Sequence, residues 1–346
     1  MLLCLLATPI VLAPVLAPNP PAAQFRDRAY APPMRIRVRD ERGFRAPFVY
    51  RQHLADRLAR RYEEDRSAVV PLQWFRNGRM ISTDASQGPL LILGADALGR
   101  DLFARLLSGA WLSLGVVVVG VVGALAIGTL AGGVAGTAGG RVETLLMLAA
   151  DFLIVLPGAY LVLVLRGVLP PVLSPGQIFG LMAVLFAIAG WPHVARGVRA
   201  IVATERTRAY AEASRAAGAG LVRQARGLMP AARGFLGVEA ALLVPALLVA
   251  EVTISFLGLG FPEPSASWGT MLQDVANVRV MTDAPWMLAP AAALFLVVLG
   301  VQLAAGADAP ASVLQLDDGA RARRPLTPAL GYADAQAQPP RPRRRP

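Results

Sequence analysis

The feature that most constrains this chain is a run of 35 residues, between Arg105 and Arg141, that contains no charged side chain. About 20 apolar residues are enough for a helix to cross the hydrocarbon core of a bilayer. Inside the run, Gly128, Gly132 and Gly136 follow a Gly-x-x-x-Gly spacing, which is typical of a helix face that packs closely against another helix. The sequence therefore predicts an all-α integral membrane protein.

Further apolar stretches extend this prediction to six transmembrane helices. The chain has 346 residues, of which 55% are hydrophobic, and its mean hydropathy is +0.50, which is too apolar for a water-soluble chain of this size. The predicted spans are residues 1–18, about 106–140, 144–165, 178–195, 235–259 and 285–306. Residues 1–18 also have the length of a signal-peptide core, but no positive residue precedes them and Ala-Pro-Asn-Pro is a poor cleavage site, so we expect a retained first helix.

The charges of the short loops predict the orientation. Residues 196–233 contain eight Arg and two Glu, whereas residues 260–284 contain one Arg and three acidic residues. Because positive residues accumulate on the cytoplasmic side, the first loop is predicted to be cytoplasmic and the second external. Residues 307–346 are rich in Pro, Ala and Arg, which predicts a disordered cytoplasmic tail whose arginines suit the anionic membrane lipid of that leaflet.

Residues 19–93 are polar and follow the first predicted helix, so we expect a small α+β extracytoplasmic insertion. Apolar and charged residues alternate over residues 34–50, which predicts a strand. The densely charged segment Arg57–Arg66 is predicted to form a solvated helix with i,i+4 ion pairs. Residues 69–81 contain an Asn-Gly pair that favours a hairpin turn.

Composition argues against several classes of function. All 34 basic residues are Arg, so the chain has no Walker A lysine and is not an ATPase. One cysteine (Cys4) and two histidines (His53 and His193) cannot build a disulfide or a structural zinc site. No Gly-x-Ser-x-Gly or His-Glu-x-x-His motif is present, so we expect neither an enzyme nor a cofactor or metal. The arginines flank apolar spans instead of forming one patch with aromatics, which argues against nucleic acid as a partner.

A motif in the basic loop 196–233 points to coupling with another protein. It consists of Glu212-Ala213-Ser214, then Gly218 after three residues, and Pro230 further on. The small residues let another surface approach closely, glycine suits a left-handed position after a helix, and proline suits the start of the next helix. The pattern resembles the EAA loop of ABC-importer permeases, a cytoplasmic helix–turn–helix that docks on the ATPase subunit. It departs from that loop in having Ser214 at the third position and one residue fewer between Gly218 and Pro230.

Other motifs strengthen the resemblance over residues 90–305. Residues 251–272 contain Ser-Phe-Leu-Gly-Leu-Gly and then Ser-Trp-Gly-x-Met-Leu, as in permeases of the dipeptide, oligopeptide and nickel importers. Residues 94–101, Gly-Ala-Asp-Ala-Leu-Gly-Arg-Asp, are similar to a stretch that precedes the second helix of the second permease subunit in these systems. The last residue of this stretch, Asp101, is suited to cap a helix.

The resemblance implies a multi-pass permease subunit in a bacterial inner membrane. Residues 94–306 would form a five-helix core that pairs with a homologous permease, two cytoplasmic ATPases and an extracytoplasmic solute-binding protein. The solute would be a di- or oligopeptide, with nickel or another small solute as the alternative. A secondary transporter or channel, or a membrane-anchored interaction protein that acts through its insertion, is a further alternative. Asp151, Glu239 and Glu251 lie in or beside apolar spans, where we expect paired or packed carboxylates.

Overall fold

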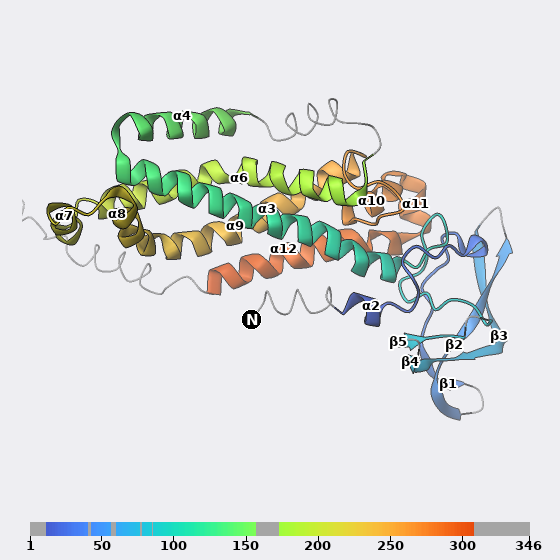
Figure 1. Cartoon of the computed structure of the whole chain (residues 1–346). Coiled ribbons are helices and arrows are strands. Elements are labelled where there is room, and N and C mark those ends of the chain that lie inside the picture. The colour runs from blue at the N-terminus through green and yellow to red at the C-terminus, as the bar shows by residue number, and fades with distance from the viewer. Residues whose placement is uncertain are drawn as a thin grey trace, which may run out of the picture. The chain divides into compact units, whose positions relative to one another are not determined.

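The computed structural model describes residues 12–40, 43–56, 60–76, 78–84, 86–156 and 173–307, and those up to Ala305 belong to one compact unit. Long helices lie side by side, and a β-rich segment is attached near their ends (Figure 1). Most of the predicted first helix, the second half of the predicted third helix and the predicted tail lie outside the described residues. Most residues of the predicted insertion (19–93) and of the predicted core (94–306) are therefore described, whereas residues 308–346 of the predicted tail are outside the described residues.

Four stretches of the described residues are long and apolar enough to cross a membrane. The first two are α3 (Leu102–Ala138) and α6 (Pro175–Glu205). The third runs from Leu221 to Phe256 and ends in α9 (Arg233–Phe256), and the fourth, Pro285–Gly306, contains most of α12 (Ala289–Ala307). These stretches match the second, fourth, fifth and sixth predicted helices. A mostly helical integral membrane protein is thus confirmed, whereas the number of six transmembrane helices remains a prediction. The helix α4 (Gly140–Val155) covers the first part of the predicted third transmembrane helix.

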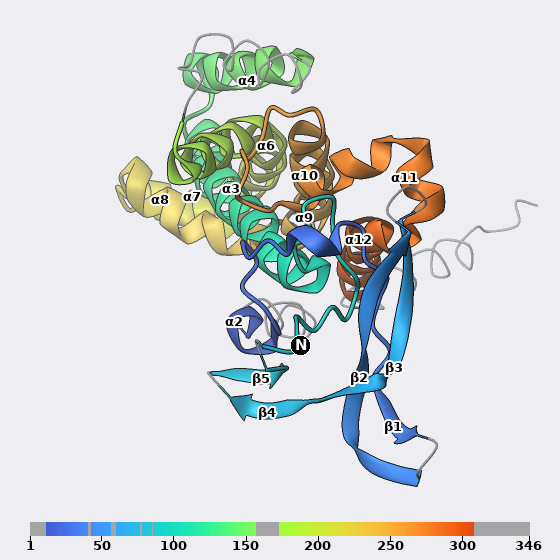
Figure 2. The same ribbon diagram turned by 90° about the vertical axis from the view of Figure 1, so that its right-hand side faces the viewer.

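The glycine face of α3 packs against α6 along its length, and both views show the two helices adjacent (Figures 1 and 2). A Cβ atom added at Gly128 would lie 2.4 Å from the Cβ of Val194, and one added at Gly132 would lie 2.4 Å from the carbonyl oxygen of Ala195. Only a glycine permits such a close approach of the two backbones. The predicted close-packing face is confirmed, and it makes α3 and α6 the centre of the bundle.

The ends of these helices follow local sequence signals. Asp101 caps α3, as predicted, because its carboxylate accepts hydrogen bonds from the backbone N–H groups of Phe103 and Ala104. Ser174 and Gln177 form a capping box at the start of α6. The connection between α3 and α4 is made by Gly139, whose φ of +67° is accessible to glycine at little cost.

Between the amino-terminal segment and α3, the described residues form two small antiparallel sheets. A three-residue 3₁₀ helix, η1 (Arg26–Arg28), and the short helix α2 (Ala13–Leu16) precede them. The larger sheet contains β1 (Arg37–Asp40), β2 (Gly43–Asp56) and β3 (Arg61–Pro71) in that order, and the smaller contains β4 (Gln73–Arg76) and β5 (Arg79–Ser82). We call this segment, residues 19–93, the β domain.

The helix predicted over Arg57–Arg66 is wrong, because residues 61–66 belong to β3. Tyr62 pairs with Leu54 of β2, and its hydroxyl donates a hydrogen bond to the carbonyl oxygen of Ala29. Glu64 forms an ion pair with Arg37 at 2.9 Å. Cross-strand pairing and packing therefore outweigh the helix propensity of Arg and Glu. The α+β description of the insertion is corrected accordingly: its described residues form strands and one 3₁₀ turn.

The hairpin predicted around the Asn-Gly pair is confirmed. Arg76 of β4 pairs with Arg79 of β5, so the loop contains only residues 77 and 78. Gly78 has a φ of +73°, as a two-residue hairpin turn requires. This short loop fixes the register of β4 and β5.

The glycine packing gives a direct test of the bundle. We expect Gly132→Ala to destabilise the protein by about 1–3 kcal/mol, because the methyl group would overpack a contact with backbone atoms. Gly237→Ala is the matched control, since a Cβ atom there in α9 would meet no atom within 4 Å. Thermal unfolding of the purified variants measures the difference, and equal midpoints would contradict this packing.

Candidate functional site

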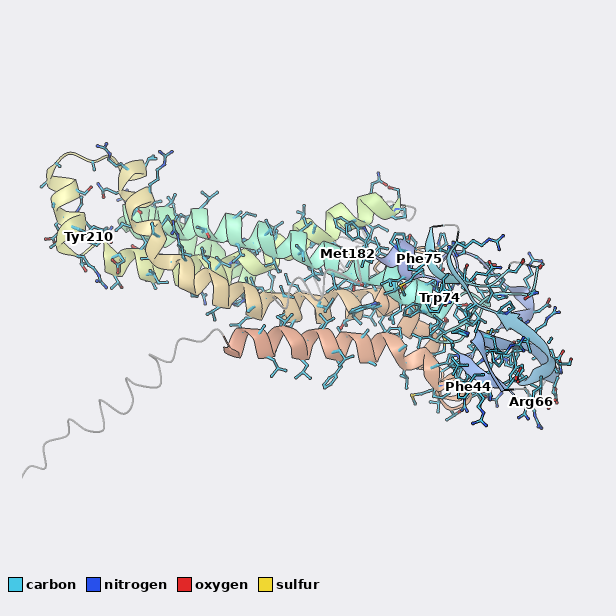
Figure 3. The ribbon with its side chains drawn as sticks, turned by 90° about the horizontal axis from the view of Figure 1, so that it is seen from below. Phe44, Arg66, Trp74, Phe75, Met182 and Tyr210 are labelled. Atoms are coloured by element: carbon cyan, nitrogen blue, oxygen red, sulfur yellow. The ribbon has the colours of Figure 1, made fainter. Side chains whose placement is uncertain are left out.

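The predicted coupling motif lies in a helix–turn–helix between α6 and α9. Its two helices are α7 (Ala209–Ala216) and α8 (Leu221–Leu228), and a one-turn 3₁₀ helix, η2 (Met229–Ala232), leads into α9. Figure 3 shows Tyr210 of α7 at one end of the bundle, opposite to the β domain with Phe44 and Arg66. The loop and the β domain are therefore at opposite ends of the membrane-length helices.

The turn between α7 and α8 has the hydrogen bonds of a Schellman motif. The N–H of Ala219 donates to the carbonyl of Ser214, and the N–H of Gly218 donates to the carbonyl of Arg215. Gly218 has a φ of +77°, so the left-handed backbone predicted at this position is confirmed. A Cβ atom there would meet nothing within 4 Å in this chain. Glycine is therefore required for the backbone conformation, and the space beside it is open.

The base of the loop is fixed to the bundle. Ala211 and Leu228 are buried, and a Cβ atom at Gly133 of α3 would lie 2.1 Å from Cε of Met229. Arg206, at the end of α6, donates a hydrogen bond of 3.1 Å to the carbonyl oxygen of Thr137 at the end of α3. The loop cannot move far without moving the ends of α3 and α6.

The tip of the loop is exposed and unusually apolar. Leu221 and Val222 at the start of α8 are 59% and 67% exposed. They border a shallow pocket together with Gly220, Arg223 and Arg226. Ala216 and Ala217 at the end of α7 are exposed as well, so small, apolar and basic side chains share this surface. Below, "loop tip" means residues 216–222.

The other predicted motif residues are exposed or only partly buried in this chain. Glu212 is exposed on the first turn of α7 and lies 3.8 Å from Arg215, so it makes no cap within the loop. Ala213 is exposed and Ser214 is partly buried. Pro230 is exposed in the first turn of η2, where its missing N–H costs nothing.

A second polar site lies beside the β domain at the start of α3, and sequence reasoning did not assemble it. Asp96 is buried and its carboxylate accepts a hydrogen bond of 2.6 Å from Nε of Arg100. Nε of Arg105 lies 3.3 Å from the same carboxylate. Glu263, from the loop between α9 and α10 (Trp268–Gln273), forms ion pairs with both arginines. These four residues, which we call the outer charge cluster, join the start of α3 to a loop about 160 residues later.

Burial and hydrogen bonds set the ionisation of the groups around this cluster. Burial disfavours the charged form of Glu263, but the hydrogen bond from Arg100 and the charge of Arg105 together hold its pKa below the usual range. Burial is the largest influence on the neighbouring Asp101 and raises its pKa to about 6. The hydrogen bonds that Asp101 accepts from Asn19 and from the first turn of α3 act in the opposite direction. Asn19 also donates to the carbonyl oxygen of Leu90, so the β domain is tied to the cap of α3.

Two of the three carboxylates predicted in or beside the apolar spans are packed or paired, whereas Glu239 is partly buried in α9. Asp151 pairs with Arg196, as expected. Glu251 is fully buried and accepts a hydrogen bond of 2.8 Å from Ser255. Beside it, α10 is seated on α3 by the indole N–H of Trp268, which donates to the carbonyl oxygen of Leu106. The Ser-Trp-Gly motif is thus a packing element between α9, α10 and α3.

Comparison with known proteins identifies the family. Residues 124–308 match the family described as the binding-protein-dependent transport system inner membrane component. The chain belongs to this family. It is 36% identical to the oligopeptide transport system permease protein OppC of Bacillus subtilis over 198 residues, which cover 56% of this chain and 62% of that protein. It is 37% identical to the nickel transport system permease protein NikC of Escherichia coli over 238 residues, or 65% and 78% of the two chains.

Family membership makes the chain a multi-pass inner-membrane permease of a binding-protein-dependent transport system, and its relatives include permeases named for oligopeptides, dipeptides and nickel. It also implies a solute-binding protein and an ATPase as partners in the same system. The matched region contains α6, the loop with α7 and α8, α9 and α12. The β domain and the start of α3 precede it.

The outer charge cluster provides a second test. Asp96→Asn would leave Glu263, whose side chain is 54% exposed, as the remaining carboxylate of the cluster beside two buried arginines, so we expect a loss of about 3 kcal/mol of stability. Asp283→Asn, at an exposed helix end, should change stability by less than about 0.5 kcal/mol. Thermal unfolding of both purified variants gives the comparison, and an Asp96→Asn permease as stable as its Asp283→Asn control would show that the cluster is unimportant.

Proposed function

We propose that this chain is the second permease subunit of an ABC importer for di- or oligopeptides. It forms one half of the solute path, pairs with a homologous permease, and couples to two cytoplasmic ATPases through loop 196–233. A solute-binding protein delivers the solute at the end of the bundle that carries the β domain. The observation that carries the proposal is the helix–turn–helix whose base is fixed to α3 and α6 and whose tip is exposed.

The mechanism follows from this difference between base and tip. The loop tip offers Leu221, Val222 and small side chains to the ATPase, so closure of the ATPase dimer on ATP would displace it. The base moves with it, because Met229 packs on Gly133 and Arg206 is bonded to the end of α3. The close backbone contacts between α3 and α6 transmit the displacement along the bundle, since densely packed helices shift as units.

The chain performs no chemistry in this proposal, and the solute is chosen largely outside it. Its relatives include permeases named for oligopeptides, dipeptides and nickel, at 36%, 40% and 37% identity. Peptide is the first candidate, since the OppC and DppC relatives both carry peptide names, and nickel is the second, supported by the longer alignment with NikC. The match to an importer family weighs against a secondary transporter or channel.

The coupling role is tested by variants of the loop. In Gly218→Asp a side chain would strain the left-handed turn by about 1 kcal/mol or more and project into the open space where the ATPase docks. In Glu212→Ala a charged hydrogen bond to the ATPase, worth about 1.5–3 kcal/mol, would be lost. We expect both variants to yield a folded permease with weakened ATPase retention and lost uptake of labelled peptide. Co-purification and uptake are the two measurements.

Gly227→Ala is the matched control. It changes a glycine in the last turn of α8, where a Cβ atom would meet nothing within 4 Å, so it should keep both ATPase binding and uptake. Normal uptake and normal ATPase retention in both Gly218→Asp and Glu212→Ala would rule out this loop as the coupling element.

A further inference from the structure

Two neighbouring aromatic side chains of the β4–β5 hairpin are exposed. Trp74 is 50% exposed and Phe75 is 79% exposed. Phe75 has a φ of +51°, which is a rare and costly conformation for a bulky residue. Successive residues of a regular strand point to opposite faces, and here both side chains remain outside the core. An exposed aromatic pair at the end of a hairpin indicates a contact with an apolar phase or surface.

The hairpin lies beside the first turns of α3, a helix long and apolar enough to cross a membrane. β5 contacts α2, and Arg79 of β5 donates a hydrogen bond to the carbonyl oxygen of Pro18. Figure 3 shows Trp74 and Phe75 near the outer ends of the long helices, and Phe44 and Arg66 farther from the bundle. Among the labelled residues of the β domain, Trp74 and Phe75 therefore lie closest to the ends of the membrane-length helices.

A groove beside the hairpin has the chemistry of a lipid site. Its walls are mainly apolar and come from α2 on one side and from Ala104, Ser108 and Trp111 of α3 on the other. Arg79 is the charged residue among those that line it. Trp111 is 60% exposed, about 14 Å along α3 from its first residue. An arginine at the rim of an apolar groove is typical of the membrane–water interface, because its charged group can reach the headgroups while its stem lies along apolar surface.

We propose that the β4–β5 hairpin anchors the β domain in the lipid headgroup region, with Trp74 and Phe75 inserted into the leaflet. In the adjacent groove an acyl chain of a phospholipid lies against α2 and α3, and its phosphate pairs with Arg79. Arg76, next to Phe75, adds a second positive charge for the headgroups. A protein partner on the aromatic pair is the competing occupant. The position beside α3 and the two flanking arginines favour lipid.

This anchor would help to hold the β domain in a fixed position relative to the bundle and the membrane. The domain is held to the bundle through Asn19 and the cap of α3, and the hairpin gives it a second attachment on the membrane side. The orientation of the chain decides only which leaflet is involved. The inference therefore does not depend on the solute or on ATPase coupling.

The test measures the depth of position 75 in a bilayer. In a Cys4→Ser background, Phe75→Cys and Phe44→Cys are each labelled with a polarity-sensitive fluorophore, and the assembled permease complex is placed in phosphatidylcholine–phosphatidylglycerol nanodiscs. Phe44 is the matched control, because it is 83% exposed but lies farther from the bundle. Spin-labelled lipids and iodide serve as the lipid-phase and aqueous quenchers.

We expect the label at position 75 to be quenched by lipids with a shallow spin label at least twofold more than the label at position 44, and to be protected from iodide. Equal iodide quenching at the two positions would overturn the proposal. Protection from iodide without lipid quenching would overturn it too, since it would assign the aromatic pair to a protein partner.

Discussion

The close contact between α3 and α6 is the interaction on which the rest of the structure depends. At Gly128 and Gly132 the two backbones approach so closely that a single methyl group would collide with the facing helix. Lipid provides no hydrophobic drive for helices to associate, so this dense packing supplies much of their attraction. The outer charge cluster and the cap of α3 lie at one end of the pair, and the base of the helix–turn–helix lies at the other. One rigid pair therefore connects the two candidate sites.

Local signals in the sequence predicted much of this arrangement. The uncharged run, the glycine spacing, the Asn-Gly hairpin and the left-handed Gly218 each depend on residues close together in the chain, and each is confirmed. The failures are non-local. β3 carries charges suited to a helix, yet its pairing with β2 decides its conformation. The outer charge cluster brings Asp96 and Glu263 together through two arginines, and no pattern of neighbouring residues in the sequence predicts that contact.

The coupling loop combines both kinds of information. Its position and its left-handed turn were predictable from the sequence, and the structure adds that its base is tied to α3 and α6 while Leu221 and Val222 are exposed. Exposed apolar residues at the end of a membrane protein that faces water indicate a protein partner. We propose that this partner is the ATPase that membership of a binding-protein-dependent transport family implies. The β domain lies outside the region that matches the family, so its role has to be inferred from its own exposed residues and contacts.

The central claim is that the loop tip faces the cytoplasm and contacts the ATPases, and cysteine accessibility tests it most directly. In a Cys4→Ser background, Val222→Cys at the tip and Val278→Cys in α11 (Val278–Asp283) are exposed to a membrane-impermeant maleimide. Intact cells should label position 278 and leave position 222 unlabelled. Inside-out vesicles should label position 222, several-fold less when the ATPases are bound. Labelling of position 222 from outside, or equal labelling with and without the ATPases, would contradict the account.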